Sequence, residues 1–163
     1  MDNKTHQVND LFKDSGGEIV SWGESYATGI MHIDDQHKKL INLTNELYHA
    51  CLAGNKALES AFKESMSRMV EYVHFHFSVE QELLKRINYP NYNDHKKQHE
   101  TLIKNILDTS KEYGEGVKFV PNHFVRTLKD WVLGHIAVYD KLYASYILEQ
   151  RNKGLISDKQ ING

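Results

Sequence analysis

Residues 69–84 read MVEYVHFHFSVEQELL, and the spacing within this stretch decides the fold. Its apolar residues recur three or four positions apart, as they do on one face of an α-helix. His76 and Glu80 fall on the same face, because His76 follows Val73 by three positions and precedes Glu80 by four. The stretch therefore predicts a helix whose buried face carries an imidazole and a carboxylate among apolar side chains.

Three further segments have the same periodicity, and no segment has the alternating pattern of a strand. The expected helices cover residues 34–54, 57–87, 91–114 and 121–150. Asp34 is expected to cap the first helix, and Pro121 is a favoured first residue for the fourth. Long amphipathic helices joined by short loops predict an all-α protein, an up-down-up-down four-helix bundle with an N-terminal extended arm.

The side chains expected to face the bundle interior follow from the same spacing. They are Ile33, Leu40, Ile41, Thr44, Leu47, Tyr48 and Cys51 on the first helix, Phe62, Met66, Met69, Val73, Leu83 and Leu84 on the second, Leu102, Ile103, Ile106, Leu107 and Tyr113 on the third, and Leu128, Trp131, Val132, Ile136 and Leu142 on the fourth. We interpret Cys51, the single cysteine, as a small buried apolar residue without a disulfide partner.

The chain of 163 residues is long enough for one domain with its own core. We expect a polar N-terminal arm over residues 1–20, partly disordered or loosely docked, and the bundle over residues 21–153, entered by an extended lead-in. Residues 154–163 are expected to form a C-terminal tail.

The net charge of −2 gives no basic footprint for nucleic acid. No apolar run approaches the roughly 18 residues of a membrane span, and the N-terminus lacks the apolar core of a signal peptide. We therefore expect a cytoplasmic protein that neither binds nucleic acid nor spans a membrane.

Histidine placement is the unusual feature of the sequence. There are ten histidines, and five of them lie on the predicted inward faces, with at least one on each helix. These five are His37, His76, His95, His99 and His135. Burying so many polar side chains without partners would destabilise the fold by several kcal/mol, so the pattern predicts a metal centre at the bundle axis.

The chemistry of the donors narrows the kind of metal site. Imidazole with carboxylate suits iron, zinc, copper or manganese, and the absence of cysteine ligands argues against structural zinc. With Glu80 and Asp140 the set has seven donors, too many for one ion. If both carboxylates bridge two six-coordinate ions that also share an oxo or hydroxo group, eleven of the twelve coordination positions are filled. The remaining position would accept a small ligand.

Asp140 fits this set only if the fourth helix is distorted. It follows His135 by five residues, which is about 140° around a regular α-helix. We predict a local π-type turn between them, because such a turn brings residues five apart onto one face. A regular helix would leave Asp140 facing solvent and outside the site.

Four motifs in order resemble those of the hemerythrin family. Residues 33–37, IDDQH, resemble I-D-x-Q-H, and residues 76–80, HFSVE, resemble H-F-x-x-E. Residues 89–99 contain Y-P followed by H-x-x-x-H, and residues 131–140, WVLGHIAVYD, are similar to W-L-x-x-H-I-x-x-x-D. The resemblance covers about residues 21–150 and is greatest to the single-domain bacterial members.

The resemblance implies how the donors are shared. One iron would take the three histidines of the third and fourth helices. The other would take the two histidines of the first and second helices and keep an open position for dioxygen. Glu80 and Asp140 would bridge the pair. In the family the Fe2+ pair binds dioxygen reversibly as a hydroperoxide on an Fe3+ pair, and the proton comes from the bridging oxygen.

Two positions depart from the family pattern. Gln81 stands where a second glutamate is frequent, and we expect little effect because that position points off the core stripe. Val132 stands where leucine is common. We expect Val132 to line a dioxygen pocket, where its smaller side chain would admit water and speed autoxidation.

The remaining histidines have no partner on the inward stripes. They are His6, His32, His49, His74 and His123. His49 and His74 each follow a glutamate, Glu46 and Glu71, by three positions, a spacing that ferritin-like di-iron proteins use. Both pairs face away from the predicted core, so we interpret them as surface pairs. Tyr143 is the tyrosine that we consider as a neighbour of the site.

These observations favour reversible dioxygen binding, for carriage, storage or supply, by a protein that is not an enzyme and has no catalytic residue. Two alternatives stay open: an oxygen or redox sensor, and a di-iron oxidase or peroxidase. About 13 residues follow Gln150, which we expect to be too few for a fused signalling domain. Five imidazoles make the centre more neutral than carboxylate-rich oxidase sites, which favours reversible binding. No protein partner is indicated.

Overall fold

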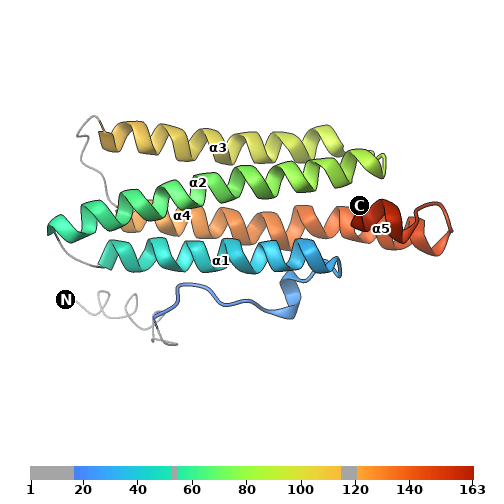
Figure 1. The fold of residues 1–163 in the computed structure, drawn as a ribbon, viewed down its shortest axis with the longest axis horizontal. Coiled ribbons are helices and arrows are strands. Elements are labelled where there is room, and N and C mark those ends of the chain that lie inside the picture. Colours follow the sequence, from blue (N-terminus) through green and yellow to red (C-terminus); the bar gives the residue numbers. More distant parts are fainter. Residues whose placement is uncertain (1–16, 53–54, 115–120) are drawn as a thin grey trace, which may run out of the picture.

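The computed structural model describes residues 17–52, 55–114 and 121–163, which are mainly helical and contain no strand (Figure 1). The helices are η2 (Glu24–Tyr26), α1 (Met31–Leu52), α2 (Asn55–Arg86), α3 (Tyr92–Gly114), α4 (Pro121–Gly134), the π-helix η3 (His135–Asp140), α5 (Lys141–Asn152) and α6 (Asp158–Asn162). None of the helices described is long and apolar enough to cross a membrane.

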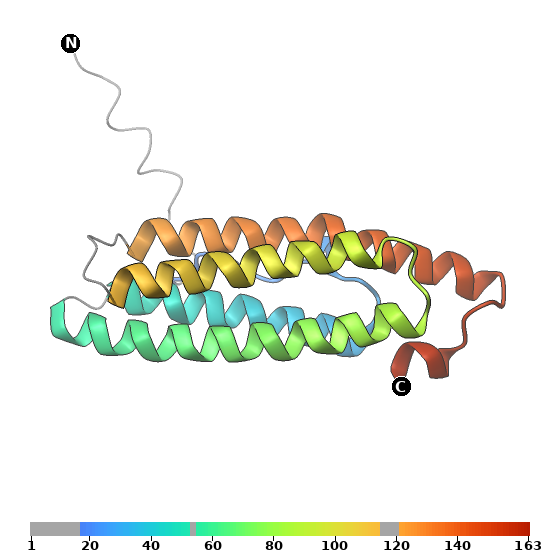
Figure 2. The ribbon, with the colours of Figure 1, turned by 90° about the horizontal axis from the view of Figure 1, so that it is seen from above.

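Four rods lie side by side along the long axis of the molecule (Figures 1 and 2). α1, α2 and α3 form three of them, and α4 continues through η3 into α5 to form the fourth. α1 packs against both α2 and α4, and α2 packs against α3. The expected all-α four-helix bundle is confirmed.

The first helix begins at Met31, three residues before the predicted start. Asp34 is therefore not its N-cap. The Asp34 carboxylate instead accepts hydrogen bonds from the backbone N–H groups of Thr28 and Gly29, at 2.7 and 3.1 Å, and from the Thr28 hydroxyl at 2.7 Å. Gly29 has a φ of 77°, a left-handed conformation that glycine adopts readily. Asp34 thus ties the lead-in to the bundle.

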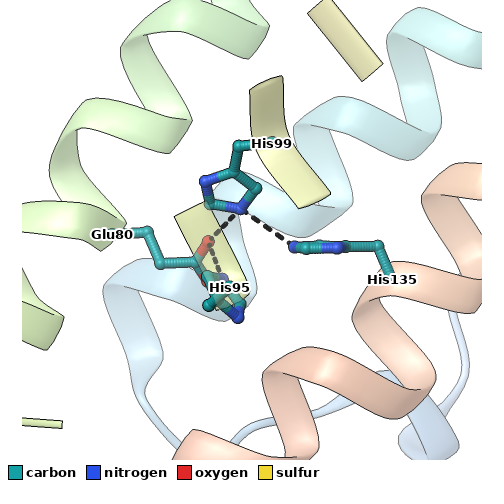
Figure 3. Close-up of side chains that lie close together, drawn as sticks. All are labelled: Glu80, His95, His99 and His135. Atoms are coloured by element: carbon teal, nitrogen blue, oxygen red, sulfur yellow. Dashed lines mark hydrogen bonds and ion pairs between the residues drawn. The ribbon is translucent and has the colours of Figure 1, made fainter. Parts of the chain in front are cut away.

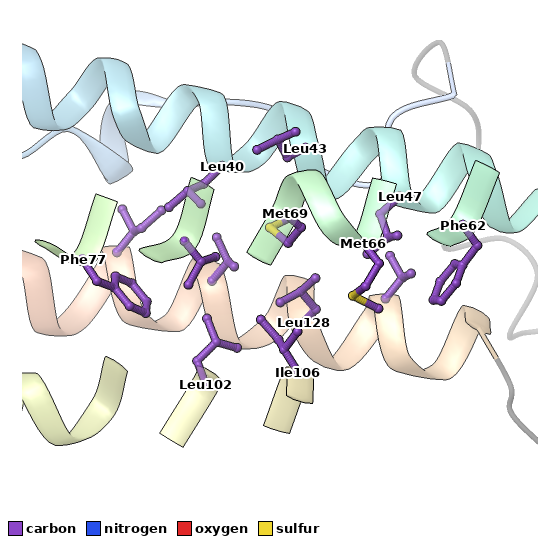
Figure 4. Close-up of a cluster of buried hydrophobic side chains, with 14 residues drawn as sticks. Leu40, Leu43, Leu47, Phe62, Met66, Met69, Phe77, Leu102, Ile106 and Leu128 are labelled. Carbon is purple, nitrogen blue, oxygen red and sulfur yellow. The ribbon is translucent and has the colours of Figure 1, made fainter. Parts of the chain in front are cut away.

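The interior has three layers along the bundle. One apolar cluster, drawn in Figure 4, includes Leu40, Met69 and Leu128, and a second includes Ile33, Leu83 and Ile147. On three of the rods the predicted metal donors lie between residues of these two clusters. We call this level of the bundle the polar layer, made of His37, His76, Glu80, His95, His99, His135 and Asp140.

Two residues predicted to face the core are exposed instead. Leu142 is 54% exposed, whereas Tyr143, one position later, is fully buried. The π-helix η3 explains this difference, because its wider turn moves every later inward position one residue along the chain. Leu107 is 52% exposed because it lies past the edge of the α3 stripe, beyond the buried Ile106. The side chain of Tyr113 lies outside the described residues.

Both ends of the described chain dock on the bundle. The backbone N–H groups of Ile19 and Val20 donate to the Asn45 side chain at 3.0 and 3.1 Å. Residues 1–16 of the predicted arm lie outside the described residues. At the other end, α6 returns to α2, and Ile156 and Ile161 join the second apolar cluster. The segment predicted as a tail therefore contributes to the core.

The reactivity of the Cys51 thiol tests whether Cys51 is a buried packing residue. The side chain is half-buried against the first apolar cluster, and burial raises the pKa of its thiol to about 11. At pH 8 the thiolate fraction is then about 10⁻³, so alkylation should be about 200-fold slower than for a free cysteine of pKa about 8.5. Rates of iodoacetamide labelling of native and denatured protein check this. Equal rates would contradict it.

Candidate metal centre

All seven predicted donors lie together in the polar layer, and none is more than 4% exposed. α1 supplies one histidine, α2 a histidine and the glutamate, α3 two histidines, and η3 the last histidine and the aspartate. The predicted π-type turn is observed over His135–Asp140, and it brings both of these side chains into the interior. The centre therefore draws on every rod of the bundle.

One group of donors surrounds the Glu80 carboxylate (Figure 3). Its Oε2 lies 3.1 Å from His95 Nε2 and 3.0 Å from His99 Nε2. His99 Nε2 lies 2.9 Å from His135 Nε2. Each of these four residues offers one ligand atom within 4.8 Å of the others, so together they could hold one metal ion.

A second group lies beside the first and shares Glu80 with it. His37, His76 and Glu80 also offer ligand atoms within 4.8 Å of one another. His76 Nε2 is 4.0 Å from Glu80 Oε2. Glu80 is thus common to two sets of imidazoles, as a ligand between two ions must be.

The two oxygens of Asp140 face different groups. Oδ1 lies 3.1 Å from His135 Nε2 and 3.6 Å from His95 Nε2, on the side of the three histidines. Oδ2 lies 3.2 Å from His37 Nε2, on the side of the two histidines. A carboxylate divided in this way has the arrangement that a bridging ligand requires.

The shortest spacings between donors are close to those of adjacent ligands in a six-coordinate site. Metal–nitrogen bonds near 2.1 Å put adjacent ligands about 3.0 Å apart in an octahedron and about 3.4 Å apart in a tetrahedron. The four shortest donor contacts around the three-histidine group measure 2.9, 3.0, 3.1 and 3.1 Å.

Several buried donor atoms lack a hydrogen-bond partner among the described residues. They are both ring nitrogens of His37, Nε2 of His76, Nδ1 of His135 and both carboxylate oxygens of Asp140. Each such atom destabilises the fold by about 1–3 kcal/mol when nothing satisfies it. Most of these atoms point into one small volume, and a cation there would satisfy them together.

The protonation states of His76, His99 and Glu80 suit metal binding. Burial lowers the pKa of His76 to about 3 and that of His99 to about 4, so both imidazoles are neutral near pH 7. Burial would by itself raise the pKa of Glu80, but hydrogen bonds with His95 and His99 outweigh it, and the pKa lies well below its ordinary value. Neutral imidazoles beside an ionised carboxylate are the forms that bind cations.

Tyr143 completes the surroundings of Glu80. Its buried hydroxyl donates a hydrogen bond to Glu80 Oε1, the carboxylate oxygen that faces away from His95 and His99. Burial and the charges of Glu80 and Asp140 raise the pKa of Tyr143 well above its ordinary value, so the phenol stays a donor. The sequence placed Tyr143 only as a candidate neighbour, since its inward position depends on the π-type turn.

Two glutamines contact histidines of the centre from outside. Gln36 Oε1 lies 2.9 Å from His76 Nδ1, and Gln81 Nε2 lies 3.2 Å from His99 Nδ1. Gln81 does point off the apolar stripe, but the expectation that this position has little bearing on the centre does not fit its contact with His99. Gln36 was missed. The available signal was that each glutamine adjoins a predicted donor in the sequence.

Aromatic and apolar side chains enclose the centre on one side. Phe77 stacks on His99 with ring centroids 3.6 Å apart, and Trp131 stacks on His135 at 4.6 Å. Val132 lines a small cavity of about 10 Å³ that also touches His76 and His135. This cavity has room for about one water-sized molecule. Val132, which we expect to line a dioxygen pocket, thus lines a cavity next to two of the predicted donors.

The Glu-x-x-His pairs lie away from the centre, as expected. His49, His74 and Glu71 are exposed, and the Glu46 carboxylate pairs with Arg68 at 2.6 Å. His6 and the side chain of His123 lie outside the described residues.

Residues 28–147 match the protein family described as hemerythrin HHE cation binding domain. The chain belongs to the hemerythrin family. The matched region contains all seven predicted donors, and six of them form the two groups that could hold a metal ion.

Relatives of this hemerythrin-family chain include a bacteriohemerythrin of Methylococcus capsulatus, which is 28% identical over 77% of this chain and 94% of the relative. A hemerythrin-like protein of Naegleria gruberi is 28% identical over 76% of this chain and 89% of its own length. The crystal structure of a wild-type hemerythrin superposes with a TM-score of 0.72 at 27% identity, covering 78% of this chain and 96% of that one. The chain is similar to these proteins over nearly their whole length.

Proposed function

We propose that this hemerythrin-family chain binds dioxygen reversibly at two iron ions held in the polar layer. The observation that carries the proposal is the division of Asp140 between the two donor groups, with Glu80 shared by both. Two carboxylates shared by two sets of imidazoles are the arrangement expected for a pair of ions. A single ion would use only one of the two sets. The match to a hemerythrin domain supports iron as the metal.

The ligands would be divided unequally. His95, His99 and His135 would hold one iron, and His37 and His76 the other, with Glu80 and Asp140 between them. The second set has one imidazole fewer, so it provides the open position for dioxygen. An oxo or hydroxo group would complete the bridge. When bound, the pair supplies the electrons that dioxygen takes up on binding and returns on release, as the ions change between Fe2+ and Fe3+.

The protein's own residues would prepare this position. Neutral His76 keeps its lone pair for the metal, and Tyr143 donates its hydrogen bond to Glu80 without giving up its proton. Leu40, Val73 and Val132 line the adjacent cavity and limit the approach of water. Exclusion of water slows the loss of the bound ligand as peroxide, which favours reversible binding.

The small cavity also argues against an enzyme that acts on an organic substrate. Its volume of about 10 Å³ suits a ligand of very few atoms, whereas sites for larger molecules measure roughly 300 Å³ or more. We therefore propose dioxygen carriage, storage or supply as the role, without a catalytic residue.

Oxygen titration of the reduced protein tests this function. The iron-loaded protein is reduced without air, exposed to dioxygen and then purged, while the visible absorption of the oxo-bridged pair is followed. We expect about two irons per chain and full recovery of the reduced spectrum on purging. One iron per chain, or irreversible oxidation at the first exposure, would contradict the proposal.

Replacing Val132 with leucine should slow autoxidation of the oxygenated protein about fourfold. The added methylene fills the cavity beside His76, and one buried methylene contributes about 0.8 kcal/mol against the entry of water. The decay of the oxygenated spectrum measures the rate. Val138→Leu is the matched control, because Val138 lies on the same rod and is exposed. An unchanged rate in Val132→Leu would remove Val132 from the pocket.

A further inference from the structure

We propose that Gln36 and Gln81 are positioning residues, each of which holds a histidine of a neighbouring helix in the orientation and tautomer that a metal ion needs. This inference rests on the proposed function, since it concerns the same centre. It adds two side chains that are not donors themselves and that act through His76 and His99.

The two glutamines occupy equivalent places beside donors. Gln36 precedes His37 on α1, and Gln81 follows Glu80 on α2. Consecutive residues of a helix point about 100° apart, so when one faces the bundle axis its neighbour faces an adjoining helix. Gln36 reaches across to His76 on α2, and Gln81 reaches across to His99 on α3. Each glutamine thus adjoins one donor in the sequence and contacts a different donor on the next helix.

The Gln36 contact determines which nitrogen of His76 carries the proton. A neutral imidazole has one N–H and one lone pair, and the amide oxygen accepts only from an N–H. Gln36 Oε1 lies 2.9 Å from His76 Nδ1, and this orientation of the amide places the proton on Nδ1. The lone pair is then on Nε2, which faces the Glu80 carboxylate in the centre. This is the form in which the imidazole binds a cation.

Gln81 can do the same for His99. Its amide lies 3.2 Å from His99 Nδ1, and a half-turn of the amide group exchanges its nitrogen and oxygen at almost unchanged positions. His99 Nε2 is turned inward, 3.0 Å from Glu80 Oε2. Without a metal, Gln81 Nε2 donates to His99 Nδ1 and His99 Nε2 donates to Glu80. A metal at Nε2 would require the proton on Nδ1, and the half-turned amide would then accept that proton through its oxygen.

The two supports are not equally important. His99 has a second support, because the ring of Phe77 stacks on it at a centroid distance of 3.6 Å. In the two-histidine group, Gln36 supports His76, and Nδ1 of His37 has no hydrogen-bond partner among the described residues. Gln36 is therefore the main support of the two-histidine group. Loss of Gln36 should weaken metal binding more than loss of Gln81.

Metal affinity of the purified full-length chain provides the test, with Co2+ as the probe and a competing chelator. Gln36→Leu keeps the size of the side chain but cannot accept a hydrogen bond, and we expect the affinity of the weaker site to fall 10- to 100-fold. Gln81→Leu should show a smaller loss. Gln36→Glu should stay close to wild type, because a carboxylate oxygen accepts the same bond.

Gln98→Leu is the matched control. Gln98 adjoins His99 in the sequence but has no hydrogen bond to any of the seven donors within the described part of the chain. If Gln36 only fills space, the order of Co2+ affinities is reversed: Gln36→Leu stays close to wild type and Gln36→Glu binds more weakly. Affinities of Gln36→Leu and Gln81→Leu within twofold of Gln98→Leu would overturn the proposal.

A second measurement needs no variant. Long-range proton–nitrogen NMR spectra of the metal-free wild-type protein report the tautomer of each imidazole, and we expect Nδ1–H for His76, whose Nδ1 faces Gln36 Oε1. Nε2–H in His76 would overturn the assignment. If the wild-type chain binds fewer than two Co2+ ions, the proposed di-metal function fails, and that result is separate from either outcome for the glutamines.

Discussion

Asp140→Ala should bind its second metal ion more than about 100-fold more weakly than the wild type and should not develop the visible spectrum of an oxo-bridged pair. The reason is that Asp140 presents one oxygen to each donor group, 3.1 Å from His135 and 3.2 Å from His37. Even residues that only support a ligand change metal affinity 10- to 100-fold, and loss of a shared ligand affects both ions. Iron analysis and absorption spectra of the reconstituted variant measure the effect.

Asp130→Ala provides the control for this substitution. Asp130 lies on the same rod, is exposed, and pairs with Lys129 at the surface. It should retain about two irons per chain and the wild-type spectrum. Two irons and an unchanged spectrum in Asp140→Ala would remove Asp140 from the centre and return the ligand set to six residues.

Removing the metal should lower the melting temperature by roughly 10 °C. A ligand that binds the folded state at about 1,000 times its dissociation constant stabilises that state by about 4 kcal/mol, and 1 kcal/mol shifts the melting of a domain of this size by about 2–4 °C. The metal-free protein also keeps the unsatisfied atoms of His37, His76 and Asp140 in its interior. Satisfying these atoms is one source of the stabilisation that the metal provides.

Thermal unfolding followed by circular dichroism compares the iron-loaded, metal-free and reloaded protein. Reloading should restore the original melting temperature. The surface variant His74→Ala should show the same difference between loaded and metal-free forms, since His74 is exposed and away from the centre. Equal melting temperatures with and without metal would mean that the polar layer is stable without a cation.

Periodicity in the sequence was sufficient to predict the bundle and the convergence of the histidines. A residue three or four positions from a buried apolar neighbour has little freedom to face elsewhere, and this holds for His76 between Val73 and Glu80. Asp140 required one further assumption, the π-type turn, and the structure contains it. Because of the same turn, Tyr143 faces the core and Leu142 does not. The prediction from the sequence applied the turn to Asp140 alone and kept regular spacing after it.

Contacts between helices were the part that periodicity could not predict. The roles of Gln36 and Gln81 depend on how far apart the helices lie and how they are rotated, which no pattern within one helix contains. The early start of α1 has a similar cause. Asp34 had the residue type of an N-cap, but its carboxylate is engaged by the turn formed by Thr28 and Gly29.

The polar layer also bears on the lifetime of the protein in a cell. It interrupts the apolar interior between two clusters, so a cation bound there would stabilise the folded state at the level where all the rods meet. Proteases act chiefly on unfolded chains, and a fall of a few kcal/mol in stability raises the unfolded fraction by several hundredfold. Chains that lack metal would be degraded first, and the abundance of the protein would follow the supply of iron.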